Sequence, residues 1–434
     1  MLEFRGGECA DVKCWEGLSV VEKVINCRSC GSTTMIHVID LGAQSLTGIF
    51  PRVTENDPSF EPLVLLRCSE CDLVQLAHNF DANLMYGDNY GYRSGLNKSM
   101  VLHLKETAEY LTSLTGPMQG KAILDIGSND GTFLSFFRDQ DLTSVGCDPT
   151  IKKFAKYYEP GIVKIDDFFP SPKVNALGLK FRIITSIAMF YDLEDPIEFT
   201  QAIEEILEDE GLWYFELSYL PLMIKNNAYD TICHEHLEYY SLKSINYILS
   251  KSKLKIIDAR LNEVNGGSIA VVVAKIDSKN VVSEGYLDLL SQEDLFFEEK
   301  DKVFNLFETG VLSHRDELKE FLGDLISTGN EVWAIGASTK GNVLLQFCGL
   351  TSSDIKGVSE INPDKFGCVT PGSRIPIVPE SDIPHNEKTY AVVLPWHFKK
   401  NIIEREKDFI LNGGTLIFPL PEIVLVNAQG ERKL

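Results

Sequence analysis

The middle of the chain changes repeatedly between short apolar runs and apolar residues at helical spacing. Residues 122–126 form an apolar run typical of a buried parallel strand, and a glycine-containing polar turn and a helical pattern follow it. Further apolar runs at 181–190 and 211–217 flank an amphipathic segment at 198–208. Residues 122–217 are therefore predicted to hold about four strand units in a doubly wound order.

A second region of this kind follows towards the carboxyl end. Residues 279–330 are predicted to be mostly helical, with acidic runs on a solvated face. Residues 331–335 then predict a strand that leads through a glycine turn into a helix. The sequence thus predicts an α/β fold with a Rossmann-like unit in the middle and a second Rossmann-like unit near the carboxyl end.

Composition narrows the classes of partner. At 434 residues, with 44% hydrophobic and 24% charged side chains, the chain is long enough for two or three domains. Lys and Arg number 41 against 63 Asp and Glu, so the net charge is 41 − 63 = −22, which opposes general nucleic-acid binding. No apolar run reaches the roughly 18 residues that a membrane span needs, and no secretion signal begins the chain. We therefore expect a cytoplasmic protein without nucleic-acid or membrane partners.

The cysteines predict a metal site near the amino end. Cys27 and Cys30 form one C-x2-C pair, Cys68 and Cys71 form another, and residues 31–67 separate them. Two such pairs place four thiolates at the corners of a tetrahedron, the arrangement of structural zinc sites. Free thiols and redox chemistry are the alternatives. A closed site of four cysteines has no open position for catalysis.

The turn after residue 126 carries the signals of a cofactor site. Gly127 fails the dinucleotide pattern G-x-G-x-x-G because no second glycine follows at the required spacing. The stretch D-I-G-S-N-D-G-T resembles instead the first motif of class I S-adenosylmethionine-dependent methyltransferases. Asp148, about 20 residues on, is expected at the ribose, and Asp167 and Phe168 at the adenine. The candidate cofactor residues in the turn are Asp125, Gly127, Ser128, Asn129 and Gly131. An ordinary strand, turn and helix without a ligand is the alternative.

Residues 85–100 form a polar loop rich in glycine and tyrosine. It is interpreted as a lid over the cofactor and substrate, with Tyr86, Tyr90 and Tyr92 as candidates. The alternative is a plain linker between domains.

Residues 229–241 concentrate histidine, glutamate and tyrosine. Imidazole is suited to moving a proton near neutral pH, and a neighbouring carboxylate orients it or raises its pKa. The H-E-H triplet lacks the histidine spacing of H-E-x-x-H, which argues against a metalloprotease. A hydrogen-bonded structural histidine pair is the alternative.

Several carboxy-terminal turns carry candidates for substrate binding. Ser338, Thr339 and Lys340 lie where a phosphate would meet a helix start, although the loop is not a Walker A motif. The other candidates are expected in close-approach turns, on the same helix or at strand ends: Asn265, Gly266, Gly267, Asn342, Asn362, Lys365, Arg374 and Trp396. Ordinary loop chemistry is the alternative for each of them.

Together the motifs resemble the sugar C-methyltransferase family over about residues 24–420. They are the paired C-x2-C, Y-G-x-x-Y-G-Y, D-I-G-S-N-D-G-T, H-E-H-L-x-Y-Y-S, N-G-G-S and G-A-S-T-K-G-N. The resemblance implies a zinc-binding domain (1–84), a class I methyltransferase domain that binds S-adenosylmethionine (85–278), and a helical segment with a Rossmann-like nucleotide-sugar domain (279–434). It also implies methyl transfer to C3 of a nucleotide-linked 4-keto-deoxysugar.

Matched to the family motif, His236 is the expected base, with Glu235 beside it and His234 supporting it or donating to the enolate oxygen. Some relatives have a tyrosine immediately before H-E-H, where this chain has Cys233, and a thiol is a poorer hydrogen-bond donor than a phenol. Three nearby tyrosines are candidates for that role, with Tyr239 kept among the catalytic residues: Tyr229, Tyr239 and Tyr240. Two other hypotheses stay open, namely methylation of a sugar oxygen, and a zinc-containing nucleotide-sugar binding protein without turnover.

Overall fold

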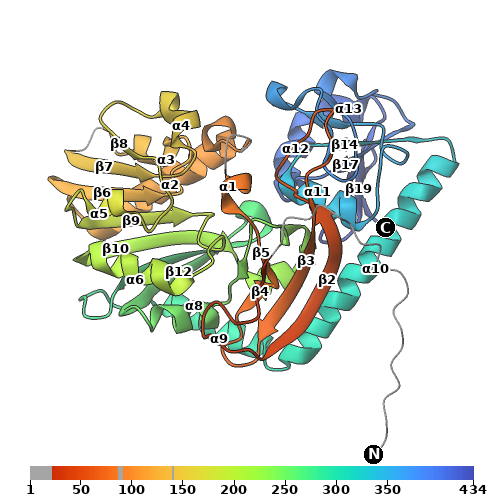
Figure 1. Cartoon of the computed structure of the whole chain (residues 1–434). Helices are drawn as coiled ribbons and strands as arrows, with labels where there is room; N and C mark the ends of the chain where they lie inside the picture. Colours follow the sequence, from red (N-terminus) through yellow and green to blue (C-terminus); the bar gives the residue numbers. More distant parts are fainter. Residues whose placement is uncertain (1–21, 87–90, 139–140) are drawn as a thin grey trace, which may run out of the picture.

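The structure, a computed structural model, describes residues 22–86, 91–138 and 141–434 (Figure 1). Cys9, Cys14 and Tyr90 lie outside the described residues. Three larger sheets make up the described chain, together with a two-stranded pairing of β1 (Glu22–Lys23) with β5 (His78–Asn79). None of the described helices is long and apolar enough to cross a membrane.

The middle sheet has the strand order β12-β13-β10-β9-β6-β7-β8. Its strands are β6 (Lys121–Ile126), β7 (Leu142–Cys147), β8 (Val163–Ile165), β9 (Phe181–Ile187), β10 (Leu207–Ser218), β12 (Leu254–Asn262) and β13 (Ser268–Lys275). Strands β6 to β10 pair in parallel, whereas β13 runs antiparallel to β10 and β12. The short β8 brings the strands within 122–217 to five, one more than the hydrophobic pattern indicated.

Helices cover this sheet at the positions that its crossovers require. They are α2 (Lys98–Thr115), α3 (Thr132–Ser135), α4 (Ile151–Phe154), α5 (Pro172–Asn175), α6 (Pro196–Ile206), α7 (Leu220–Lys225) and α8 (Leu242–Leu249). Helix α6 begins after Asp195, whose side chain accepts from the backbone N–H of Glu198 and caps the first turn. The predicted helix at 198–208 therefore starts two residues earlier and ends where β10 begins.

The carboxy-terminal sheet has the order β16-β15-β14-β17-β18-β19-β20. Its strands are β14 (Glu331–Ile335), β15 (Val358–Glu360), β16 (Ile377–Pro379), β17 (Thr389–Val393), β18 (Thr415–Phe418), β19 (Val424–Asn427) and β20 (Gly430–Lys433). Helix α11 (Thr339–Phe347) follows β14, and α12 (Lys399–Arg405) and α13 (Lys407–Leu411) lie before β18. The predicted helical segment before this sheet consists of α9 (Glu284–Phe296) and the long α10 (Lys300–Ser327).

The last strand of the amino-terminal sheet comes from the middle of the chain. Its order is β11-β4-β3-β2, with β2 (Met35–Ser45), β3 (Phe60–Cys68), β4 (Val74–Leu76) and β11 (Glu238–Tyr239). Strand β11 begins two residues after the H-E-H triplet and pairs antiparallel with β4. The triplet therefore directly precedes the strand that joins the amino-terminal sheet. The ring of His234 contacts Phe80, which comes just before the short α1 (Ala82–Met85).

One apolar core joins the amino-terminal and carboxy-terminal sheets. Buried Val38, Leu63 and Leu65 of the first sheet belong to the same cluster as Phe307 of α10 and Val343 of α11. Burial of that shared surface is the main force that fixes the two sheets relative to each other.

Candidate active site and metal centre

A cavity of about 360 Å³ opens at the carboxyl ends of β6, β7, β9 and β10. This is the edge at which open parallel sheets bind ligands, and the volume is typical of small-molecule sites. The predicted site residues that line it are Tyr86, Tyr92, Asp125, Gly127, Ser128, Asn129, Asp148, Asp167, Phe168, Glu235, His236, Asn265, Thr339 and Lys340. The cavity thus connects the glycine turn after β6 with the H-E-H triplet and the start of α11.

The turn after β6 requires glycine at two places. Gly127 has φ +74°, and a Cβ there would lie 3.0 Å from Cγ of Met189. Gly131 has φ +76°, and a Cβ there would lie 2.8 Å from Cδ1 of Tyr158. Both glycines therefore adopt a backbone conformation that other residues rarely take. Gly127 lines the cavity, whereas Gly131 shapes the turn from behind, against Tyr158.

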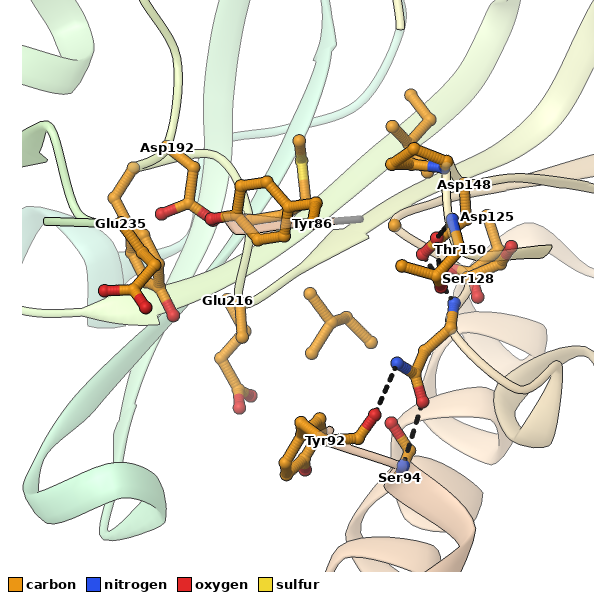
Figure 2. A pocket seen from close by; sticks show the side chains of 18 of the residues that line it. Tyr86, Tyr92, Ser94, Asp125, Ser128, Asp148, Thr150, Asp192, Glu216 and Glu235 are labelled. Carbon is orange, nitrogen blue, oxygen red and sulfur yellow. Dashed lines mark hydrogen bonds between the residues drawn. The ribbon is translucent and has the colours of Figure 1, made fainter. Parts of the chain in front are cut away.

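Asp148 closes the turn from the end of β7. Its Oδ2 accepts from the Asn129 backbone N–H (2.8 Å), and its Oδ1 accepts from the backbone N–H (2.6 Å) and hydroxyl (2.5 Å) of Thr150. These three bonds orient the buried carboxylate and leave it accepting capacity for a ligand hydroxyl. Asp125 lies beside it in Figure 2, accepts from the Thr185 hydroxyl (2.6 Å), and has its pKa raised to about 7 by burial.

The loop before α2 touches the turn directly. The side-chain amide of Asn129 donates to the Tyr92 carbonyl (3.2 Å) and accepts from the Ser94 backbone N–H (3.0 Å), as the dashed lines in Figure 2 mark. The Tyr92 side chain is 50% exposed at the cavity rim, and Phe168 is 40% exposed on another part of the lining. These exposed rings are free to contact a ligand.

His236 is fixed in one tautomer by the backbone. Its Nδ1 lies 2.9 Å from the carbonyl oxygen of Thr231, which only accepts, so Nδ1 carries the proton and Nε2 keeps its lone pair. Burial, followed by the positive charge of Lys340, lowers the pKa of His236 to about 3. The imidazole is therefore neutral at pH 7 with its Nε2 lone pair unprotonated, and the same lowering of the pKa makes it a weaker base than a free imidazole.

Two carboxylates face this side of the cavity. Glu235 and Asp192 lie near each other in Figure 2, and the Tyr86 hydroxyl hydrogen-bonds to Asp192. Burial raises the pKa of Glu235, and burial with the nearby negative charges of Glu235 and Glu238 raises that of Asp192 well above its usual value.

Among the lining residues that belong to no motif singled out in the sequence are the polar side chains Asp192, Glu216 and Ser218. Asp192 follows β9, and Glu216 and Ser218 end β10. Their position after strands of a doubly wound sheet was the available signal. Glu216 accepts from His103 Nε2 (2.9 Å), Tyr214 and Asn262.

His234 and Tyr239, predicted among the catalytic residues, lie outside the lining of the cavity. His234 is fully buried, with Nε2 3.3 Å from the Glu61 carbonyl and its ring edge-on to Phe80. The Tyr239 hydroxyl donates to the Thr231 carbonyl (3.4 Å). The chain turns at residues 234–235, where the His236 N–H donates to the Cys233 carbonyl (3.2 Å), and this turn lets His234 point away from the cavity that Glu235 and His236 line.

Of the carboxy-terminal candidates, Asn265, Thr339 and Lys340 reach the cavity. Lys340 donates to the Asn265 carbonyl (2.7 Å) and is the one Lys or Arg among the described lining residues. The other candidates lie outside the lining: Gly266, Gly267, Ser338, Asn342, Asn362, Lys365, Arg374 and Trp396.

Protein groups already engage several of those side chains. Ser338 caps α11 by accepting from the Gly341 N–H (3.1 Å), and Asn362 caps a short 3-10 turn. Trp396 donates to buried Asp230 (2.7 Å), Lys365 donates to the Ala337 carbonyl (2.7 Å), and Gly266 packs on the Trp396 ring.

The four paired cysteines come together at one end of the amino-terminal sheet. Their Sγ atoms all lie within 4.8 Å of one another, and the pairs Cys27 with Cys71 and Cys30 with Cys68 are each 3.4 Å apart. None of these cysteines is in a disulfide. Four thiolates at this spacing fit a tetrahedral structural zinc ion and leave no open coordination position.

Three family models match consecutive parts of the chain. They describe a zinc binding domain at 27–86, a methyltransferase domain at 102–259 and a C-methyltransferase C-terminal domain at 263–421. The chain is also 28% identical over 416 residues to C-methyltransferase NovU of Streptomyces niveus, which covers 94% of this chain and 99% of that protein. The three consecutive matches and this relative support a place for the chain in the sugar C-methyltransferase family.

Solved methyltransferases match less than half of the chain. A Clostridium acetobutylicum S-adenosylmethionine-dependent methyltransferase is 16% identical with a TM-score of 0.31, covering 40% of this chain and 90% of its own. Magnesium protoporphyrin IX methyltransferase of Synechocystis is 12% identical with a TM-score of 0.33, covering 44% and 90%. Nothing about function follows from similarities this low.

This C-methyltransferase is therefore an S-adenosylmethionine-dependent enzyme with a structural zinc site. The residues present fit both groups. The glycine turn approaches the cavity without a Cβ, Asp148 is held at its edge, and the four sulfur atoms form a closed donor set.

Replacing Cys68 with serine is expected to abolish stable zinc binding, because three thiolates and a weak hydroxyl ligand hold the ion poorly. Plasma emission spectrometry of purified protein measures this as metal content per chain. Cys368→Ser is the control, since this buried cysteine lies outside the cluster. Equal zinc content in both variants would contradict the assigned ligand set.

Asp148→Ala is expected to weaken S-adenosylmethionine binding by about 10-fold or more, because a charge-assisted hydrogen bond is lost and the Asn129 turn loses its acceptor. Isothermal titration calorimetry measures the change. Asp209→Ala, at a carboxylate whose side chain is 98% exposed, provides the control. Unchanged affinity in Asp148→Ala would remove this residue from the cofactor site.

Proposed function

We propose that the enzyme methylates C3 of a nucleotide-linked 4-keto-deoxysugar through base-catalysed enolate formation and in-line methyl transfer. The observation that carries the proposal is the neutral His236 imidazole, which shares one cavity with the cofactor turn. We also propose that residues 1–84, 85–278 and 279–434 act as the zinc-binding, methyltransferase and nucleotide-sugar domains.

The charge of the cavity suits a cationic methyl donor. Lys340 is the one Lys or Arg of the described lining, against the carboxylates of Asp125, Asp148, Asp167, Asp192, Glu216 and Glu235. S-adenosylmethionine supplies an electrophilic methyl group on a positively charged sulfonium when it is bound. The buried carboxylates favour a ligand of that charge and orient it for an in-line approach of carbon.

His236 is proposed to remove the proton from C3. The Thr231 carbonyl holds Nδ1–H, so the free Nε2 is the accepting atom. Tyr191 packs on the imidazole with ring centroids 4.2 Å apart and limits its rotation. A base held in one orientation and one tautomer loses little entropy in the proton transfer.

Lys340 is proposed to stabilise the negative charge that arises when the proton leaves. Its ammonium group lies in the lining next to Asn265, and Coulombic repulsion from it lowers the pKa of His236. The same position suits the enolate oxygen or the anionic part of the nucleotide sugar.

Cys233 lines the cavity where some relatives have tyrosine. The tyrosines considered as substitutes point elsewhere: Tyr229 bonds to His314, Tyr239 to the Thr231 carbonyl and Tyr240 to the Phe190 carbonyl. Tyr86 does line the cavity and contacts Asp192. We propose that the Tyr86–Asp192 pair supplies the hydroxyl and acid function on this side of the substrate.

His236→Gln is expected to lower turnover by about 100-fold or more while S-adenosylmethionine affinity stays near that of the wild type. The assay incubates enzyme with nucleotide 4-ketosugars in heavy water and follows C3 by NMR, without and then with S-adenosylmethionine. Deuterium exchange at C3 followed by methyl gain is expected for the wild type, and neither for His236→Gln. His37→Gln, at a half-exposed histidine on β2, is the control.

Methyl gain on oxygen, without exchange at C3, would replace the proposal with O-methylation. Unchanged turnover in His236→Gln would remove this histidine from the role of base.

A further inference from the structure

The connection between β2 and β3 extends from the amino-terminal sheet to the active site. Residues 46–59 form this connection. The hydroxyl of buried Thr47 lies 3.4 Å from Oε2 of Glu235. The four cysteines lie near the opposite end of the same two strands, next to the Met35 and Cys68 pairing.

Gly48 makes the closest approach to Glu235. A Cβ on Gly48 would lie 2.2 Å from Oε1 of Glu235 and 3.8 Å from Oγ1 of Thr339. Its φ lies outside the left-handed region, so the backbone there suits any residue. A Cβ at this position would therefore displace the Glu235 carboxylate, which is the flexible end of its side chain.

Helix α11 holds the start of this connection. The side-chain amide of buried Asn342 donates to the Thr47 carbonyl (2.7 Å). Gln346, one turn further, accepts from the Ser45 backbone N–H (2.8 Å) and donates to the Ser45 carbonyl (3.1 Å). The same helix begins with Thr339 and Lys340, which line the cavity, so one rigid element fixes both.

The carboxy-terminal part also holds the rest of the connection. Arg374 donates to the carbonyls of Val53 (2.8 Å) and Glu55 (2.9 Å). Arg52 donates to the Phe366 carbonyl (2.8 Å), and the Val369 N–H donates to the Pro51 carbonyl (2.9 Å). Arg374 and Asn342, which were expected at the substrate, thus hold this connection through hydrogen bonds to its backbone carbonyls.

We propose that Thr47 and Gly48 are positioning residues for Glu235. The Thr47 hydroxyl donates to one carboxylate oxygen, and the bare Cα of Gly48 lets the other approach the backbone. Together they fix the direction in which Glu235 enters the cavity beside His236. The proposal rests on the proposed function only in that Glu235 takes part in methyl transfer.

The first test is Gly48→Ala. The added methyl displaces the Glu235 carboxylate, so kcat is expected to fall by about 10-fold or more, because small misplacements of active-site groups cost this much. S-adenosylmethionine affinity, zinc content and melting temperature are expected to stay unchanged. Gly323→Ala is the control, since a Cβ there meets nothing within 4 Å on helix α10. Wild-type kcat in Gly48→Ala would overturn the proposal.

The second test separates the hydroxyl of Thr47 from its shape. Thr47→Val keeps the shape and removes the donor, and it is expected to lower kcat several-fold and move the acid limb of the pH profile upwards. The sign follows because a donor stabilises the ionised carboxylate, so its loss raises the pKa of Glu235 further. Thr47→Ser is expected to restore most of the loss. Equal losses in both variants, with no pH shift, would overturn the role of the hydroxyl.

A double-mutant cycle tests whether Gly48 acts through Glu235. In Glu235→Ala the carboxylate is absent, so adding Gly48→Ala is expected to change the residual turnover by less than about twofold. Loss by the full single-mutant factor in that background would overturn the proposal. Methyl transfer is followed as S-adenosylhomocysteine release, whichever acceptor the enzyme uses. If Glu235→Ala alone kept wild-type turnover, the role proposed for Glu235 would fall, and the positioning proposal with it. A failure confined to Gly48→Ala and Thr47→Val would leave that role intact.

Discussion

The pairing of β11 with β4 is the constraint on which the active site depends. Strand β11 follows the H-E-H triplet, and the Leu76 N–H donates to the Leu237 carbonyl (2.9 Å) to continue the pairing. On the other side, the Tyr191 carbonyl accepts from the backbone N–H groups of Leu237 and Glu238. The backbone after the triplet is thus hydrogen-bonded both to the amino-terminal sheet and to the loop after β9. These bonds fix the positions of His236 and Glu235. The four-cysteine site lies at the end of β3 and before β4, the strand with which β11 pairs.

The second feature is the amount of buried acid around the cavity. Burial penalises ionised carboxylates, and it raises the pKa values of Asp125, Asp148, Asp192 and Glu235. Several are stabilised by donors from the protein, such as Thr185 for Asp125 and Thr150 for Asp148. A bound cation would reduce the free-energy cost that remains for burying these ionised carboxylates. That reduction would strengthen the binding of the methyl donor. Burial and Lys340 keep His236 neutral in the same cavity, and the same lowering of its pKa reduces its strength as a base.

Local patterns predicted the parts of the fold that rest on local physics. The strand and glycine turn at 122–131, the helices at 284–327 and the strand before α11 all follow from apolar periodicity and turn residues. Strand β11 did not, because two residues carry no periodic signal and their partner β4 lies far away in sequence. The same limit applies to the cavity. Its cofactor side follows a motif, whereas Asp192 and Glu216 were signalled only by their position at strand ends. Thr47, which contacts Glu235 beside the cavity, comes from a segment without a distinctive pattern. Asn342 and Arg374 have side chains that could bind a substrate. In the structure they donate instead to backbone carbonyls of the connection between β2 and β3.

Two glycines show why some residues cannot be predicted from the sequence around them. Gly127 belongs to a turn that needs a positive φ, so the sequence pattern of the turn predicts glycine at this position. Gly48 has an ordinary backbone, and its small size leaves space for the side chain of Glu235, which lies 188 positions after the adjacent Thr47. A steric requirement of this kind exists only after the amino-terminal sheet, α11 and the H-E-H segment have packed together. The carboxylate and the glycine then define one close contact, in which neither residue can change size without moving the other.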